Sequence, residues 1–273
     1  MIASPTFDIS TSPNQPITMK LLIVSDIHAN WPALRAVLDA EPDADRILCL
    51  GDLVDYGPQP VECVEWAMKN ARTDLIIQGN HDWGAGQNKD PRCSPPYRKL
   101  SAATQELCLR VMSVAMLAFL RELQPMRTFQ MGVASCVACH AAPSEPLFRY
   151  LRINGADRHL EAEIKTAGNP DYLFFGHTHW PVIIHSGKTL VVNPGSVGQP
   201  KDGDSRAAYA VWQDGRVALR RAAYDIEETV RAYGGTQLEA ADIAALAHVL
   251  RTGGNLPEEM VTISPNNSDA REA

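Results

Sequence analysis

The sequence predicts an α/β protein in which a largely parallel sheet is extended by antiparallel hairpins to give a pair of mixed sheets. In the first half of the chain, short apolar runs without polar alternation are separated by helical segments, a pattern typical of parallel strands covered on both faces. In the second half, Ser186-Gly187 and Asp214-Gly215 separate β-rich runs, and such pairs are typical of hairpin turns.

The composition is that of an ordinary folded domain. The chain has 273 residues, of which 45% are hydrophobic and 21% are charged, so it is long enough for a large core. Its net charge of −7 argues against an extended nucleic-acid surface, which needs a clustered basic face. A small phosphorylated substrate remains compatible with this charge, because bound divalent cations supply positive charge locally.

Neither end of the chain predicts a membrane segment. The N-terminus has no basic start followed by an apolar core, so we expect no secretory signal. The longest apolar helical run, residues 111–120, is too short to span a bilayer. A cytoplasmic location with reduced thiols is therefore predicted. Residues 1–18 and 255–273 are polar and predicted to be tails, which leaves residues 19–254 as the domain.

The first half contains predicted strands at residues 21–25, 46–50 and 75–77. A predicted helix follows each strand: one after Asn30, one starting near Pro58, and a long one over about residues 100–123. Residues 84–99 are rich in turn-forming residues and are predicted to be a loop.

The second half contains predicted strands at residues 133–139 and 171–175, hairpins at residues 181–193 and 207–222, and helices at residues 156–167 and 226–251. The hairpins add antiparallel strands to the parallel ones of the first half. No internal repeat of fixed period is present.

Each of the five apolar strands that precede these hairpins ends in side chains that can bind a metal ion. The exits carry Asp26 and His28, then Asp52 and Asp55, then Asn80, His81 and Asp82, then His140, then His177 and His179. Because α/β sheets place ligands at the carboxyl ends of their strands, we expect these side chains to converge in exit loops. Five exits of this chemistry are hard to explain as solvated loop residues.

The predicted ligand set is too large for a single ion. Its members are Asp26, His28, Asp52, Asn80, His140, His177 and His179. They exceed the positions of a tetrahedral zinc site and suit two ions that share a bridging carboxylate. Asp52 lies on a glycine-flanked turn and suits that bridging role best. Mixed nitrogen and oxygen ligation without thiolate favours Mn, Fe, Zn, Co or Ni over Mg or Ca.

The order of these motifs resembles the calcineurin-like metallophosphoesterase superfamily, in particular its small bacterial and archaeal phosphodiesterase-type members. The motifs are D-x-H, G-D, G-N-H-D, a single His and G-H-x-H, and the resemblance covers about residues 19–254. It implies a sandwich of two mixed β-sheets flanked by helices. It also implies a dinuclear phosphoesterase that hydrolyses a small phosphodiester or phosphomonoester, nucleotides included, by attack of a hydroxide held between the ions.

The resemblance also assigns a role to each residue. Asp26, His28 and His179 would hold the first metal, Asn80, His140 and His177 the second, and Asp52 would bridge them. His81 would bind the phosphoryl oxygens or protonate the leaving oxygen, and Asp82 would orient its ring. Asp55 would be either a residue behind the ligands or a turn residue.

Two departures from the family pattern bear on the alternatives. Ala29 stands where the family has glycine after D-x-H, and Tyr56 stands where Ser/Thr protein phosphatases have arginine. The protein-phosphatase alternative is therefore weak, and a non-catalytic interaction scaffold is disfavoured because the ligand set is complete. Cys136, Cys139 and His140 match the c-type haem attachment pattern. We reject that interpretation, since haem attachment needs export and strand residues three apart face opposite ways.

Overall fold

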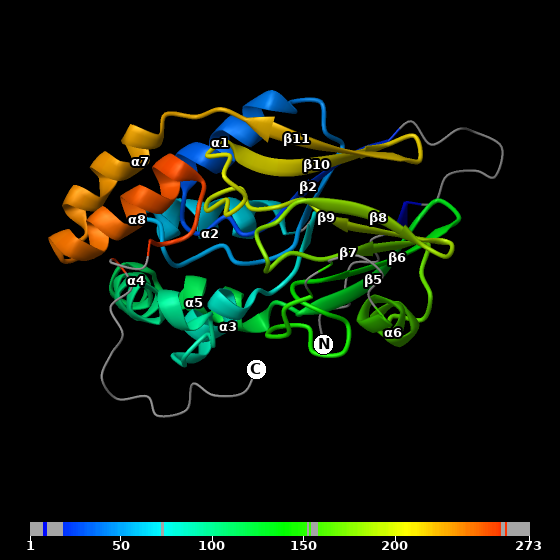
Figure 1. Ribbon diagram of the computed structural model, residues 1–273, viewed down its shortest axis with the longest axis horizontal. Coiled ribbons are helices and arrows are strands. Elements are labelled where there is room, and N and C mark those ends of the chain that lie inside the picture. Colours follow the sequence, from blue (N-terminus) through cyan, green and yellow to red (C-terminus); the bar gives the residue numbers. More distant parts are fainter. Residues whose placement is uncertain are drawn as a thin grey trace.

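The protein is a sandwich of two mixed β-sheets with helices on the outer faces, as its computed structural model shows (Figure 1). The structure describes residues 8–9, 19–71, 74–151, 153, 158–257 and 260. Most of the two predicted tails falls outside these residues, so the predicted domain limits stay predictions. The predicted fold class is confirmed, including the mixed character of both sheets.

The five-stranded sheet has the order β11-β10-β2-β3-β4. Its members are β2 (Lys20–Val24), β3 (Arg46–Cys49), β4 (Leu75–Ile76), β10 (Ala207–Gln213) and β11 (Arg216–Ala222). The three strands of the first half are parallel, and β10 joins them antiparallel to β2. The predicted hairpin at Asp214-Gly215 links β10 to β11, so the parallel first half is completed by a hairpin as expected.

The six-stranded sheet has the order β1-β5-β6-β7-β9-β8. Its members are β1 (Asp8–Ile9), β5 (Met126–Met131), β6 (Ala134–Cys139), β7 (Tyr172–Phe174), β8 (Val182–Ser186) and β9 (Thr189–Asn193). Strands β6, β7 and β9 are parallel to one another. Strand β5 pairs antiparallel with β6, and β8 pairs antiparallel with β9. Strand β5 was not predicted, because its polar residues interrupt the apolar pattern that marked the other strands.

The core explains why the central strands read as continuous apolar runs. In β2, Leu21 and Ile23 face the core between the two sheets, whereas Leu22 and Val24 face the outer helices. Helices α1 (Trp31–Ala40) and α2 (Pro60–Asn70) cover the five-stranded sheet, and α6 (Arg158–Thr166) covers the six-stranded sheet (Figure 1). Both faces are therefore buried, as a parallel sheet requires.

The positions of Cys136 and Cys139 on strand β6 test the prediction that these two cysteines face opposite ways. Cys136 packs in the core between the sheets, and Cys139 packs on the opposite face near α6. The two thiols therefore face opposite ways, as predicted. Burial raises the pKa of the Cys136 thiol to about 12, so it is protonated and behaves as a small apolar side chain.

The long helix predicted over residues 100–123 is wrong, because the structure has two helices there. These are α4 (Arg98–Val111) and α5 (Val114–Glu122). Ser113 separates them and caps α5, since its side chain accepts a hydrogen bond from the Met116 backbone N–H at 3.3 Å. Similarly, the helix predicted over residues 226–251 is divided into α7 (Ile226–Ala232), η2 (Tyr233–Gly235) and α8 (Ala240–Thr252).

The loop predicted over residues 84–99 is also partly helical. Helix α3 (Asn80–Gln87) begins within the G-N-H-D motif, and the short helix η1 (Pro95–Tyr97) leads into α4. Asn80, His81 and Asp82 therefore form the first turn of a helix and not a loop. Within the described residues, every helix is too short or too polar to cross a membrane.

Candidate metal centre

The predicted ligands meet in one buried cluster at the carboxyl ends of the strands. Two sets of three side chains place their donor atoms within 4.8 Å of one another: Asp26, His28 and His179 form one, and Asp52, His140 and His177 form the other. Asn80 belongs to the second set, because its Oδ1 lies 3.0 Å from His140 Nε2. The structure thus brings together all seven residues that the motifs singled out, and Asp52 lies with the second group.

Backbone carbonyls fix the orientation of three imidazole rings. The Nδ1 atoms lie 3.0 Å from Val54 O in His28, 2.7 Å from Leu50 O in His140, and 2.6 Å from Gln199 O in His179. A carbonyl can only accept, so each neutral ring carries its proton on Nδ1. Each Nε2 therefore presents a lone pair to the centre, the arrangement that a metal-binding histidine needs.

The ligand atoms of the cluster lie close to one another. His28 Nε2 lies 3.1 Å from His179 Nε2, and His140 Nε2 lies 3.2 Å from Asp52 Oδ2. In the part of the chain that the structure describes, the buried atoms Asp26 Oδ1 and His177 Nε2 have no hydrogen-bond partner. Buried acceptors left this way are costly unless a cation satisfies them. The residues present therefore fit the metal ions that the motifs predict.

The charge balance of the cluster supports the same conclusion. Burial lowers the pKa of His177 to about 3. At His140 burial also disfavours the charged form, but the Asp52 carboxylate outweighs it and raises the pKa to about 9. A proton on His140 is thus the group that balances Asp52 when no cation does, and a cation would compete with that proton for the same lone pair.

Most of these ligands sit in the left-handed backbone region, which is uncommon outside glycine. The φ angles are +53° for Asp26, +47° for His28, +56° for Asp52, +65° for His177 and +60° for His179. Such strain clusters at functional sites and persists only where surrounding contacts enforce it. Ala29 follows with φ of +49°, which explains why a glycine suits this position and why alanine must be held there by its neighbours.

Two glycines let the exit loops approach closely. A Cβ on Gly79 would lie 2.0 Å from Asp52 Oδ1, and a Cβ on Gly176 would lie 2.0 Å from Ser25 Oγ and 2.9 Å from Asp26 Oδ2. Any side chain at either position would displace a predicted ligand or its neighbour. The glycines of the G-N-H-D and G-H-x-H motifs are therefore needed for space.

His81 lies beside the ligands and contacts a carboxylate. Its Nδ1 is 2.7 Å from Asp55 Oδ2, and its ring centroid is 5.2 Å from that of His28. Ser101 Oγ and Cys108 Sγ also donate to the Asp55 carboxylate, at 3.4 and 3.5 Å. Although burial lowers the pKa of His81, the carboxylates of Asp52 and Asp55 raise it by more. Asp55 thus holds the ring and favours its protonated form.

The prediction that Asp82 orients His81 is wrong. The Asp82 carboxylate accepts hydrogen bonds from the backbone N–H groups of Asp52, Leu53 and Gly79, at 2.8, 2.8 and 2.9 Å. Successive side chains on α3 point about 100° apart, so Asp82 cannot contact the ring of its neighbour. Burial and the Asp52 charge raise the pKa of Asp82 to about 7, and the backbone N–H groups of Gly79 and Leu53 oppose that rise. Asp82 anchors the Asp52 loop.

Sequence reasoning missed two further side chains next to the cluster. The Tyr150 ring lies 3.9 Å from the His177 ring, centroid to centroid. Lys201 follows two residues after Gln199, and its charge adds to burial in lowering the pKa of His179. Neither residue lies at a strand exit, so the exit pattern gave no signal for them.

Comparison with known proteins agrees with this geometry. Residues 19–214 match the calcineurin-like phosphoesterase superfamily domain. An uncharacterized protein of Methanocaldococcus jannaschii is 31% identical over 228 residues, which cover 76% of this chain and 89% of that protein. The phosphodiesterase YfcE of Escherichia coli is 24% identical over 196 residues, which cover 68% of this chain and 83% of that protein.

Solved structures show the same likeness. A metallophosphoesterase from Sphaerobacter thermophilus has a TM-score of 0.70 and is 31% identical in sequence. The match covers 86% of this chain and 99% of that protein's chain. A hypothetical protein from Pyrococcus horikoshii shares the fold, with a TM-score of 0.75 at 21% identity over 87% of this chain and 99% of its own. With its motifs, fold and clustered ligands, this chain belongs to the calcineurin-like phosphoesterase superfamily.

Proposed function

We propose that this protein is a dinuclear metal-dependent phosphoesterase that hydrolyses a small phosphodiester or phosphomonoester. The observation that carries the proposal is the pair of adjoining buried ligand groups whose acceptor atoms face one another. Such an arrangement is unfavourable without cations and suited to two of them. The donors are imidazole, carboxylate and amide, which suit Mn, Fe, Zn, Co or Ni.

Each group would hold one ion. Asp26, His28 and His179 would hold the first, Asn80, His140 and His177 the second, and Asp52 would serve both. Asp52 Oδ2 lies 3.2 Å from His140 Nε2 and 3.7 Å from His28 Nε2, so it contacts a ligand of each group. Two ions bound here would supply an activated water and neutralise charge on the phosphoryl group.

His81 would act on the leaving group. Because Nδ1 faces Asp55, the ring has Nε2 available for a substrate oxygen. A proton on Nε2 would pass to the leaving oxygen as the phosphorus–oxygen bond breaks, and the Asp55 carboxylate would stabilise the imidazolium before that transfer. Asp55 is therefore a positioning residue that acts through His81.

A substrate panel with matched metal analysis tests the proposal. The purified protein is incubated with Mn, Zn, Co or Ni and assayed on aryl phosphates, aryl phosphodiesters and cyclic nucleotides, while bound metal is counted by mass spectrometry. We expect two ions per chain and turnover of at least one ester class. A protein that holds two ions but hydrolyses none of these esters would show that the proposed function is wrong.

A further inference from the structure

A cavity of about 450 Å³ opens beside the metal centre. One part of its wall is shared with that centre, because Thr178 lies between the predicted ligands His177 and His179. A second part is Tyr150, whose ring packs against the His177 ring. The cavity is within the size range of pockets for small organic ligands. A group attached to a phosphate at the metal centre would therefore extend into it.

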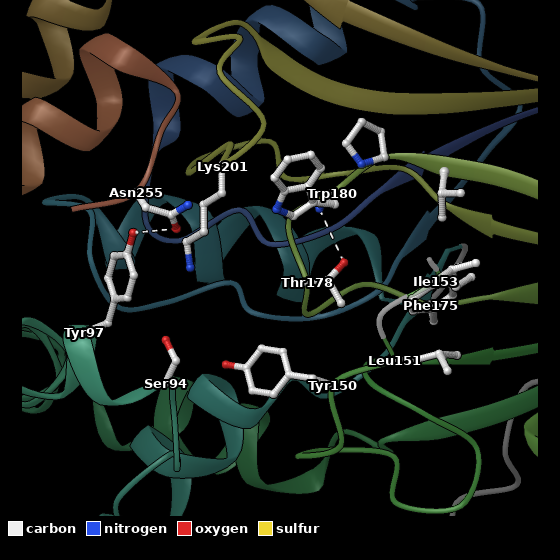
Figure 2. Close-up of a pocket in the computed structure, with 12 residues that line it drawn as sticks. Ser94, Tyr97, Tyr150, Leu151, Ile153, Phe175, Thr178, Trp180, Lys201 and Asn255 are labelled. Carbon is white, nitrogen blue, oxygen red and sulfur yellow. Dashed lines mark hydrogen bonds between the residues drawn. The ribbon is translucent and has the colours of Figure 1, made fainter. Parts of the chain in front are cut away.

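Aromatic side chains form much of this wall. Tyr97, Tyr150 and Trp180 all line the cavity, and Figure 2 shows Trp180 and Tyr150 on opposite sides of it, with Tyr97 next to Asn255. The Trp180 side chain remains 54% exposed, so part of its ring surface is uncovered by protein. Exposed tryptophan next to a cavity is suited to stacking against a flat ring.

Polar groups beside Tyr97 complement these rings. Lys201 Nζ lies 4.1 Å from the centre of the Tyr97 ring. The Tyr97 hydroxyl donates to Asn255 Oδ1 at 3.4 Å. An amide offers both donors and an acceptor, and therefore can pair with the heteroatom edge of a base. A ligand with both a flat ring and polar edge atoms, as a nucleotide base has, would match the aromatic and the polar parts of this wall.

We propose that this cavity binds the base-bearing half of a nucleotide ester, with the base stacked against Trp180 and Tyr150. Lys201 then lies where it can contact a phosphate oxygen or the edge of the base. This assignment rests on the proposed function for the position of the reacting phosphate. It narrows the substrate class from small phosphate esters in general to nucleotides.

Isothermal titration of the manganese-loaded protein tests the assignment. The probes are adenosine 5′-monophosphate, uridine 5′-monophosphate and ribose 5-phosphate, which has the same phosphate and sugar but no base. We expect at least one nucleotide to bind about ten-fold more tightly than ribose 5-phosphate, the size typical of base stacking on aromatic side chains. Equal affinity of all three probes would overturn the proposal.

Variants at one position separate stacking from loss of structure. Trp180→Ala should weaken nucleotide binding at least about five-fold and leave ribose 5-phosphate binding and metal content unchanged. Trp180→Phe, which keeps an aromatic face, should retain most of the preference for nucleotides. Equal weakening of nucleotide and ribose 5-phosphate binding by Trp180→Ala would also overturn the proposal.

The same samples are assayed for hydrolysis of bis(p-nitrophenyl) phosphate. Turnover of this diester without any preference for nucleotides leaves the phosphoesterase proposal intact and removes the assignment of the cavity. Tight nucleotide binding that depends on Trp180, in a protein that hydrolyses no ester, supports the cavity and removes the catalytic proposal. The two failures are therefore distinguishable.

Discussion

Replacing Asp55 by asparagine should slow hydrolysis without removing metal. Asparagine has the shape of aspartate, and its amide oxygen can still accept a hydrogen bond from His81 Nδ1, which lies 2.7 Å from Asp55 Oδ2. What disappears is the negative charge that stabilises the imidazolium. Asp55 has no donor atom in either ligand group, so the metal-binding residues keep their positions.

The size of the effect follows from the contact that is weakened. A hydrogen bond to a charged group contributes about 1.5–3 kcal/mol, which corresponds to a rate loss of about 10- to 150-fold if it acts fully in the transition state. His81→Ala removes the proton donor itself and should cost about 100- to 10,000-fold. Adding Asp55→Asn to His81→Ala should cause no further loss, because Asp55 acts only through the imidazole.

Asp82→Asn is the matched control, since it changes a neighbouring buried acid in the same way. Asp82 accepts three backbone N–H groups that hold the Asp52 loop, so this variant should lose thermal stability and bound metal together. Asp55→Asn should retain both. The measurements are kcat on an aryl phosphodiester, metal content by mass spectrometry, and the melting temperature.

The opposite pattern would refute this reasoning. If Asp82→Asn keeps its metal and its melting temperature but loses rate, while Asp55→Asn is as active as the wild type, then Asp82 orients His81 and the assignment of the two acids is wrong. Additive losses in the Asp55→Asn/His81→Ala double variant would equally show that Asp55 acts by another route.

Three further changes test the surroundings of the centre. Asp52→Ala should lose bound metal and activity together, measured by mass spectrometry and by turnover, because Asp52 contacts both ligand groups. Gly79→Ala should also lose metal, since its Cβ would lie 2.0 Å from Asp52 Oδ1; full metal content in this variant would contradict the close approach. Although burial raises the pKa of Glu41, hydrogen bonds from Lys20 and Arg220 hold it below the ordinary 4.5. Its contribution to stability is therefore present above that pH and is lost as the pH falls further. Glu41→Gln should be about 1–3 kcal/mol less stable than the wild type at neutral pH, and the gap in urea unfolding should narrow as the pH falls below 4.5.

The parts of the site that could be predicted from sequence are those fixed by strand ends. A short apolar run followed by Asp, Asn or His gives both the element and the place where its side chains emerge. The hairpin turns were equally local signals, and Asp214-Gly215 joins β10 to β11 as expected. The parallel order of the strands brings together the exits of β2, β3 and β4 in one sheet and those of β6 and β7 in the other. Convergence of the two sets depends in addition on how the two sheets pack.

The parts that could not be predicted depend on where a helix begins. With Asn80, His81 and Asp82 placed in a loop, any neighbour of His81 could orient its ring. Because α3 begins at Asn80, the His81 ring and the Asp82 carboxylate point in different directions. Asp55, from another loop, contacts the His81 ring instead. The break between α4 and α5 was missed for a similar reason, since the cap at Ser113 lies within an apolar run.

The left-handed backbone at the ligands is the least predictable feature, and it explains how the centre is held. The loops bind one another through their main chains: Asp26 N–H donates to Gly51 O at 3.0 Å, His28 N–H to Asp52 O at 2.8 Å, and Gly198 N–H to Asp26 O at 3.0 Å. These bonds do not involve ligand side chains, so they persist when a ligand is replaced. The backbone therefore arranges the donors before any ion binds, and removal of one ligand side chain should empty the centre without unfolding the protein.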